Sequence, residues 1–346
     1  MKEAMRRIMV VTAEAATDGY STKVLTHGSG PQTGIIMDRA ALSEKAGMHP
    51  LYLRYATMDL IGSLGMTFQH LIHKVVAGKR LQDFFGEGTS RVTLNPTAFI
   101  VDPATMKPAK PIGGALDEAQ VAARKTEGYT VENRDGKGQR VLVPSPKLLE
   151  TFDDDLFAIA SAIKGGALSI AGGTGGLALE DVGGGVLEPR DAVIDKDRAW
   201  VRIMMDLATK HGVTFDTGVI FIDAPVVCKD FSRVKPALEE AIAEERALQG
   251  EGEYRGMHNI QYDKLLEIFS QGDAISHIAA ADMKAMLEGG QGSSFSGGAI
   301  AKVEAACDLV LKAGARRAII CCLDNFARAL MDGDAGTIIE RGTTWA

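Results

Sequence analysis

The run Thr26 to Gly34, with the sequence THGSGPQTG, constrains the fold of this chain more than any other stretch. It follows a β-prone segment, Tyr20 to Leu25, and leads into a long helical pattern. Small residues between a strand and a helix let backbone N–H groups face outward, where they can hold an anionic group at the helix N-terminus. We call this run the opening loop. It predicts an anion-binding loop, and a tight strand-to-helix turn without a ligand is the alternative.

Two further glycine-rich segments border predicted strands and helices. Gly172 to Gly176, the second glycine loop, directly follows a buried strand, Ala167 to Ala171. Gln291 to Gly298 opens onto a helix, Ala299 to Ala313. Because α/β sheets bind ligands at the carboxyl ends of their strands, these loops predict an α/β fold that carries a binding site.

The apolar periodicity predicts the remaining elements. Helices are expected over residues 4–16, 35–46, 57–76, 152–164, 198–211, 236–249, 262–269 and 279–287. Strands are expected over residues 97–101, 128–132, 140–143, 217–222, 316–323 and 337–340, and a buried strand over Lys23 to Leu25.

Composition changes between Arg91 and Lys147, where six of the chain's 11 prolines fall. Short strand-like pieces alternate there with turns rich in proline and glycine, which predicts a small flap that closes over a site. Pro108 and Pro111 stand on either side of Lys110 and restrict the backbone that carries it. Lys110 is therefore a candidate site residue, and a solvated lysine in a surface turn is the alternative.

Two more lysines stand at the starts of predicted helices. Lys196 lies between Asp195 and Asp197 at a helix N-terminus, and Lys302 lies in the first turn of a later helix. A cation gains nothing from the helix dipole at this end, so both placements indicate that an anion binds nearby. Asp195 is expected to cap its helix, and Asp197 to hold lysine ammonium groups in position.

The overall composition excludes several classes of partner. The net charge is −7, from 38 basic and 45 acidic residues, so no sequence-wide basic field recruits nucleic acid or an anionic membrane. No apolar run approaches the length of a membrane span. The four cysteines show neither metal-ligand spacing nor a disulfide framework. We expect a cytoplasmic protein without nucleic-acid or membrane partners.

Glycine loops combined with lysines at loop tips and helix starts suit phosphoryl transfer between small molecules. In that chemistry the protein positions donor and acceptor and neutralises spreading charge with lysines, backbone N–H groups and Mg²⁺. The chain has neither a Walker A motif nor the catalytic loop of protein kinases.

Two other kinds of site fit the sequence less well. Gly173-x-Gly175-x-x-Ala178 matches a dinucleotide-binding pattern, but the glycines at 183–185 and a following proline leave no room for the helix that this pattern opens. His70 and His73 stand three residues apart on a predicted helix, a spacing that can serve metal ligands. No third ligand is evident, so we expect packed or surface histidines.

These residues together resemble carbamate kinases, within the amino-acid kinase superfamily. The matching pieces occur in the family's order over nearly the whole chain. They are THGSGPQ at 26–32, DLIG at 59–62, VDP at 101–103, KPIG at 110–113, VPSPK at 143–147, AGGTGG at 171–176, VIDKD at 193–197, KVEAA at 302–306 and GT at 336–337.

The resemblance implies a three-layer α/β/α sandwich around a mainly parallel open sheet, with a small protruding flap. As a member of that fold the chain would form one domain over 1–346, with the flap at about 91–147 and a helical insertion at about 231–277. The implied reaction is reversible phosphoryl transfer between ATP and carbamate, which yields carbamoyl phosphate and ADP and uses Mg²⁺. The family also implies a homodimer.

Roles for individual residues follow from the resemblance in the same way. Lys110, Lys196 and Asp197 would be catalytic: Lys110 reaches the carbamate or the phosphoryl group, Lys196 neutralises the phosphoryl group, and Asp197 orients the lysines. Gly28 and Ser29 would bind substrate, with Gly172 and Gly173 nearby. Lys302 and Asp223, together with Lys196, would bind the nucleotide, and no side chain would bind a metal directly.

The chain also departs from the family pattern. Carbamate kinases have a first strand with a Gly-Gly-Asn loop, whereas this sequence starts at what would be the following helix. Ser29 replaces an asparagine, and the residues before Lys302 read GAIA instead of SMGP. Two alternatives therefore stand beside a carbamate kinase: a kinase of another small carboxylate-type acceptor, and a catalytically impaired binding or assembly subunit.

Overall fold

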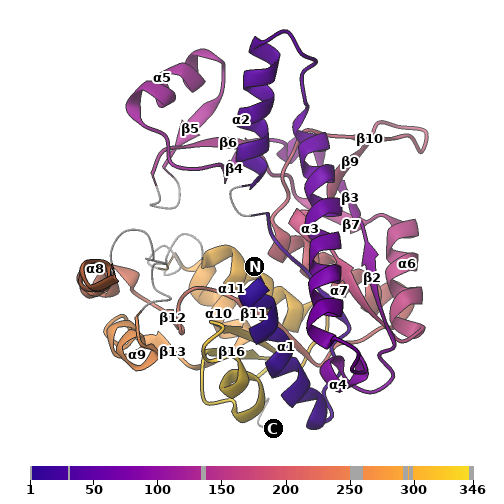
Figure 1. Cartoon of the computed structure of the whole chain (residues 1–346), viewed down its shortest axis with the longest axis vertical. Helices are drawn as coiled ribbons and strands as arrows, with labels where there is room; N and C mark the ends of the chain where they lie inside the picture. Colours follow the sequence, from indigo (N-terminus) through magenta and orange to yellow (C-terminus); the bar gives the residue numbers. More distant parts are fainter. Residues whose placement is uncertain are drawn as a thin grey trace. The chain divides into compact units, whose positions relative to one another are not determined.

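The computed structural model describes residues 2–29, 32–133, 138–249, 260–290, 295 and 299–342. The chain divides into two compact units, Met1–Val213 and Thr214–Ala346 (Figure 1). The opening loop, the flap and the second glycine loop belong to the first unit.

The first unit is organised around strand β8 (Ala167–Ala171). It lies between β1 (Val24–Leu25) and β2 (Arg91–Asn95), and both neighbours run parallel to it. All five residues of β8 are buried, as expected for a parallel strand covered on both faces. The opening loop therefore leaves β1 at the same edge at which the second glycine loop leaves β8.

A second sheet of the first unit contains one parallel and two antiparallel pairs. Its central strands β9 (Leu177–Asp181) and β3 (Ala98–Val101) are parallel. On the outside, β10 (Leu187–Pro189) pairs with β9, and β7 (Leu148–Thr151) pairs with β3, both antiparallel. After β8 the chain thus makes a 3₁₀ turn, η2 (Gly173–Gly175), and enters a strand, so the dinucleotide-binding pattern at Gly173 opens no helix.

Helices cover these strands. Helices α1 (Lys2–Thr17), α3 (Leu53–Val76) and α4 (Gln82–Phe85) share a core with β2 and β8, which includes Met9, Ile72, Phe85, Leu168 and Ile170. Helix α6 (Asp153–Lys164) packs on β8, and α7 (Lys196–His211) packs on β7. No helix in the described parts of the chain is long and apolar enough to cross a membrane.

A small three-stranded antiparallel sheet stands apart from these strands. Its order is β4 (Pro108–Ile112), β6 (Arg140–Pro144) and β5 (Thr130–Glu132). It includes neither β2 nor β3, which pair with β8 and β9. Between β4 and β5 the chain forms the helix α5 (Glu118–Thr126), which a capping box at Asp117 begins. Within the predicted flap 91–147, the separate sheet therefore starts at Pro108, after the short turn η1 (Pro103–Thr105).

Helix α2 (Gln32–Lys45) lies beside this small sheet (Figure 1). Met37 of α2, Ile112 of β4 and Val141 of β6 pack against a cluster that contains Leu53 and Val193. We call α2, β4, β5, β6 and α5 together the flap lobe.

The second unit has a four-stranded sheet in the order β11, β15, β16 and β14. Strands β11 (Thr217–Phe221) and β15 (Arg317–Cys321) are parallel, β16 (Thr337–Glu340) is antiparallel to β15, and β14 (His277–Ala279) is parallel to β16. Helices α10 (Ala280–Glu288) and α11 (Ile300–Leu311) pack together, and the π-helical turn η5 (Arg328–Asp332) follows β15.

A separate layer of the second unit lies mostly within the predicted insertion 231–277, with one short strand just before it. It contains α8 (Phe231–Gln249), α9 (Tyr262–Ser270) and the antiparallel pair of β12 (Val227–Cys228) and β13 (Ala274–Ile275). These elements have their own core, with Val234, Leu238, Leu265 and Phe269 among its buried residues.

The α/β fold with parallel strand pairs is confirmed, and so are the predicted helices, with shifted ends. The strand predicted over Lys23 to Leu25 is present, but its expected burial was wrong. Strand β1 contains only Val24 and Leu25, both half-buried, because it pairs with β8 on one side only and lies at the edge of its sheet. The segment 291–298, predicted as a third loop, lies outside the described residues except for Phe295, which is buried.

Candidate functional site

The opening loop and the second glycine loop are bonded to each other. The Thr26 hydroxyl donates to the carbonyl oxygen of Gly172 at 3.1 Å. The backbone N–H of Thr174 donates to the carbonyl oxygen of His27 at 2.7 Å. Both bonds follow from the parallel pairing of β1 with β8, which brings the two strand ends side by side.

His27 fills the space between these loops. Its ring stacks on Phe68 of α3 with 5.0 Å between centroids, and only 5% of the residue is exposed. A Cβ on Gly173 would lie 2.4 Å from the Nε2 atom of His27, so only glycine fits at position 173. No sequence pattern singles out His27 for this contact, because its partner Phe68 lies 41 residues further along the chain (68 minus 27).

Burial lowers the pKa of His27, because the imidazolium form loses its hydration there. The folded state therefore holds His27 neutral, with the carbonyl oxygen of Gly28 3.5 Å from Nδ1. The unfolded chain binds this proton more readily than the folded chain as the pH falls through the ordinary histidine pKa of about 6.5.

We expect the free energy of unfolding to fall between pH 7.5 and 5.5, and to fall less in His27→Gln. The stabilising contribution of neutral His27 is present above about pH 6.5 and is lost below it, at up to about 1.36 kcal/mol for each pH unit and proton. Urea unfolding at the two pH values measures the difference. His73→Gln, at an exposed position of α3, is the control. Equal pH dependence in wild type and His27→Gln would contradict the assignment.

The second glycine loop uses backbone conformations that favour glycine. Gly172, Gly175 and Gly176 have φ values of +63°, +92° and +76°, and Thr174 between them has φ +53°. A Cβ on Gly175 would lie 2.1 Å from the carbonyl oxygen of Ile194. The loop is therefore packed directly against the backbone that leads into Asp195.

Lysines from two distant segments meet the carboxylates at the start of α7. The Lys110 ammonium group from β4 forms an ion pair with Asp195, and the Lys196 ammonium group forms one with Asp197. Asp195 also caps α7, since its carboxylate accepts from the backbone N–H of Asp197 at 2.9 Å. We call these four residues the lysine–aspartate cluster.

Burial differs sharply within the lysine–aspartate cluster. The Asp197 side chain is 4% exposed and that of Asp195 is 15% exposed, whereas both lysine side chains are 32% exposed. The carboxylates are thus fixed in the protein, and the ammonium groups can reach a ligand from solvent. The carboxylates can therefore hold both ammonium groups in place for an incoming anion.

The substrate-side glycines lie against this cluster. A Cβ on Gly28 would lie 3.0 Å from the Cδ atom of Lys196, so the lysine side chain passes directly over Gly28. The Ser29 hydroxyl is 2.9 Å from the hydroxyl of Thr33 in the first turn of α2. Of the opening loop, Gly30 and Pro31 lie outside the described residues.

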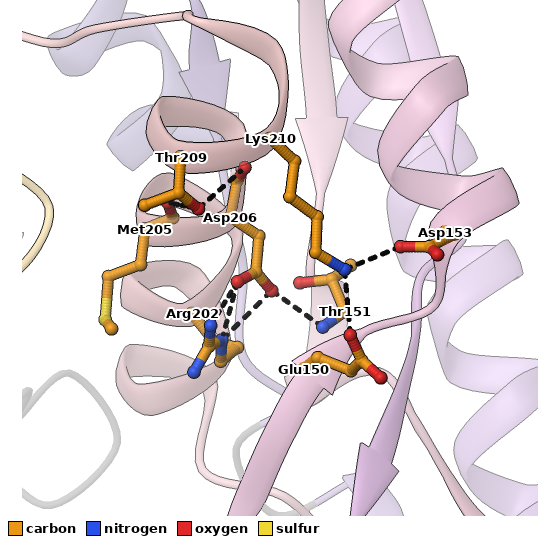
Figure 2. A network of polar contacts seen from close by, with 8 residues as sticks. All are labelled: Glu150, Thr151, Asp153, Arg202, Met205, Asp206, Thr209 and Lys210. Carbon is orange, nitrogen blue, oxygen red and sulfur yellow. Dashed lines mark hydrogen bonds and ion pairs between the residues drawn. The ribbon is translucent and has the colours of Figure 1, made fainter.

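A second set of charges holds α7, which carries Lys196, against β7 (Figure 2). The buried Asp206 carboxylate accepts the backbone N–H of Thr151 at 2.7 Å and the Nε–H of Arg202 at 3.0 Å. Lys210 donates to Glu150 at 2.8 Å and to Asp153 at 2.7 Å, and these bonds raise the pKa of Lys210. These contacts join the C-terminal half of α7, at Asp206 and Lys210, to β7 and to the first turn of α6.

The predicted nucleotide residues Asp223 and Lys302 lie in the second unit. Asp223 is exposed and follows β11, and Lys302 is half-buried in the first turn of α11. Ala299, just before α11, lines one small cavity together with Ile222 and Ala224. The two residues thus stand near the same end of the second unit.

The remaining candidates are the two histidines of α3 and the cysteines. His70 and His73 are exposed, and the described residues contain no group of three or more His, Cys, Asp and Glu side chains that could hold a metal ion. All four cysteines are buried without disulfides. Burial raises the pKa of Cys228 to about 11 and of Cys307 to about 12, so neither thiol is reactive at neutral pH.

No protein-family model matches the chain, but individual proteins and solved structures do. A carbamate kinase from Clostridium perfringens is 27% identical over 350 residues, which cover 98% of this chain and 92% of that protein. A carbamate kinase from Giardia lamblia bound to citric acid superposes with a TM-score of 0.71 at 23% identity, over 98% of this chain and 90% of that one. The Giardia lamblia enzyme bound to AMP-PNP gives a TM-score of 0.66 at 23% identity, with the same coverage. The similarity to carbamate kinases extends over nearly the whole chain, and the fold is theirs.

Proposed function

Because the chain is a homologue of the carbamate kinases and has their fold, we propose that it transfers a phosphoryl group reversibly between ATP and carbamate. Carbamoyl phosphate and ADP are the products in the direction of carbamate phosphorylation. The observation that carries the proposal is the lysine–aspartate cluster, in which two lysines from segments 86 positions apart reach one helix N-terminus beside Gly28 (196 minus 110).

In the proposed reaction Lys196 neutralises the charge that spreads over the transferring phosphoryl oxygens. Lys110, on the flap lobe, binds the carbamate or the same phosphoryl group from the other side. Asp195 and Asp197 hold the two ammonium groups before substrates bind, so little reorganisation is needed at the moment of transfer. The substrate side of the site is formed by small residues, so backbone groups can approach the substrate closely. These residues are Gly28, Ser29, Gly172 and Gly173.

The nucleotide part of the proposal rests on Lys302 and Asp223. Lys302 stands in the first turn of α11, where a phosphate is favoured by the helix N-terminus. A carbamate kinase of the same fold has been solved with AMP-PNP, which supports ATP and ADP as the nucleotides. Mg²⁺ neutralises nucleotide phosphates when bound, and we propose that these phosphates hold it, without a dedicated side-chain cluster.

The test of the acceptor is ADP release from Mg-ATP in the presence of carbamate, acetate or other small carboxylates, measured one acid at a time. The proposal predicts that carbamate gives the highest kcat/KM. Faster turnover of another acid would favour a kinase of that acceptor. No turnover with any acid, together with no shift of the melting temperature by Mg-ATP, would favour a binding or assembly subunit. A bound ligand at 100 times its Kd adds about 2.7 kcal/mol of stability.

We also propose that the chain forms a homodimer and is located in the cytoplasm. The dimer contact is inferred from one face of α3, which exposes Tyr55, Met58 and Met66 at 47%, 44% and 64%. Gly62 lies between them, and no atom of the described chain would touch a Cβ there within 4 Å. A glycine in a helix interior costs about 1 kcal/mol relative to alanine, so its presence fits a point where the α3 helix of a second copy crosses closely.

We expect Gly62→Ala to weaken the dimer, and Met66→Lys to dissociate it at micromolar concentration. The added Cβ separates the two helices, and a lysine at position 66 places a charge in an apolar contact. Light scattering after size-exclusion chromatography measures the mass. Leu248→Lys, at an 80% exposed position of α8, is the control. A helix face that is free in solution would instead make Gly62→Ala more stable by about 1 kcal/mol, with no change of mass.

A further inference from the structure

Two glycines, one in the opening loop and one in the flap, touch through their backbones. A Cβ on Gly34, in the first turn of α2, would lie 2.1 Å from the Cα atom of Gly113 and 2.4 Å from its backbone nitrogen. Gly34 is buried, and Gly113 follows β4 with φ +73°. Neither position tolerates a side chain without movement: position 34 for lack of space, position 113 for its backbone conformation.

Other contacts make α2 and the small sheet one body. Asp38 of α2 forms an ion pair with Arg124 of α5, and Lys45 forms one with Glu127 at 3.1 Å. These pairs lie on the exposed side of the flap lobe, where each contributes less than about 1 kcal/mol. The Gly34–Gly113 contact is buried at Gly34, and Figure 1 shows α2 beside the strands of the small sheet.

This contact lies close to the reacting groups at both ends. Along α2, Gly34 is five residues from Ser29, and along the flap, Gly113 is three residues from Lys110. In the register of the small sheet Lys110 stands opposite Val143, and the carbonyl oxygen of the next residue, Pro144, accepts the N–H of Val193 at 2.9 Å. Strand β4, which carries Lys110, is therefore linked to α2 through Gly113 and, through its partner strand β6, to the segment that leads to Asp195.

We infer that Gly34 is a positioning residue, whose contact with Gly113 sets the distance of Lys110 from the opening loop and from Asp195. The inference rests on the proposed function for its consequence in catalysis, but the placement of Lys110 itself can be measured without turnover. Any residue larger than glycine at position 34 separates α2 from the end of β4. The Lys110 ammonium group then leaves the Asp195 carboxylate.

The direct test is the reactivity of Lys110 in Gly34→Ala. Brief acetylation with an amine-selective reagent, followed by peptide mass spectrometry, should show Lys110 labelled several-fold faster in the variant, since its ion pair is broken. Lys164, exposed at the end of α6, should be labelled at an unchanged rate. Gly114→Ala is the matched control, because a Cβ at that neighbouring glycine meets no atom within 4 Å. Unchanged Lys110 labelling in a folded Gly34→Ala would overturn the inference.

A double-mutant cycle with Lys110→Met then tests the catalytic consequence. Gly34→Ala should lower kcat about 10-fold to 100-fold in the wild-type background and have almost no effect in the Lys110→Met background. The same decrease in both backgrounds would show a general structural role and contradict positioning. If Gly34→Ala does not fold, Gly113→Ala replaces it at the same contact, since its Cβ would meet only the Cα atom of Gly34, at 3.6 Å, and its strain comes from φ +73°. A smaller decrease of a few-fold is then expected, and no decrease would count against the inference. A wild type that transfers no phosphoryl group would refute the proposed function. The labelling experiment would then still test whether Gly34 positions Lys110.

Discussion

Replacing Lys196 with methionine is expected to lower kcat for phosphoryl transfer about 10²–10³-fold, with a much smaller change in KM. The ammonium group meets a charge that is fully developed only in the transition state, and loss of one such preorganised group typically costs about 3–4 kcal/mol. Methionine keeps most of the apolar stem that lies over Gly28, so the opening loop keeps its packing. Initial rates of ADP formation from Mg-ATP and carbamate measure the effect.

The matched control for this substitution is Lys210→Met. Lys210 lies near the other end of the same helix and also forms ion pairs, with Glu150 and Asp153. These groups are largely exposed, so the control should lose less than about 1 kcal/mol of stability and keep its kcat within twofold. Equal rates in Lys196→Met and Lys210→Met would remove Lys196 from the mechanism.

Gly175→Ala should lower the free energy of unfolding by about 3 kcal/mol or more. The new Cβ would overlap the carbonyl oxygen of Ile194 at 2.1 Å, and φ at this position is +92°. Strain at positive φ costs about 1–2 kcal/mol for a residue with a side chain, and forced displacement of packed groups adds about 1–3 kcal/mol. Because Ile194 directly precedes Asp195, relief of the overlap shifts the start of α7, and kcat should fall as well.

Gly184→Ala separates these two costs. Gly184 has φ +66°, but no atom lies within 4 Å of a Cβ at that position. This variant should lose only the cost of the backbone conformation, about 1–2 kcal/mol, with unchanged kcat. Urea unfolding of both variants gives the comparison. A Gly175→Ala loss no larger than that of Gly184→Ala would show that the second glycine loop is not packed against Ile194 as described.

Much of the α/β fold could be predicted from the sequence because its signals are local. Apolar periodicity marks the helices, and a buried run followed by glycines marks the end of β8. The cap at Asp195 was also a local signal, since an aspartate before a helical pattern is a common N-cap. The lysines at 110 and 196 could be singled out because prolines or helix starts limited where they could stand.

Contacts between distant segments could not be predicted from the sequence. The stacking of His27 on Phe68 joins residues 41 positions apart, and the Gly34–Gly113 contact joins residues 79 positions apart (68 minus 27, and 113 minus 34). Neither pair leaves a periodic pattern in the chain. The exposure of β1 was missed for the same reason, because an edge position depends on which strands pair and not on the residues of the strand itself.

Phosphoryl transfer at the lysine–aspartate cluster is tested most directly by the formation of ATP from carbamoyl phosphate and ADP, followed by ³¹P NMR in the presence of Mg²⁺. In the wild type the carbamoyl phosphate signal should be replaced by the γ-phosphate signal of ATP. With Lys196→Met the carbamoyl phosphate signal should disappear only at the rate of spontaneous hydrolysis. Hydrolysis to inorganic phosphate without ATP in the wild type, or equal ATP formation in both proteins, would contradict phosphoryl transfer at the lysine–aspartate cluster.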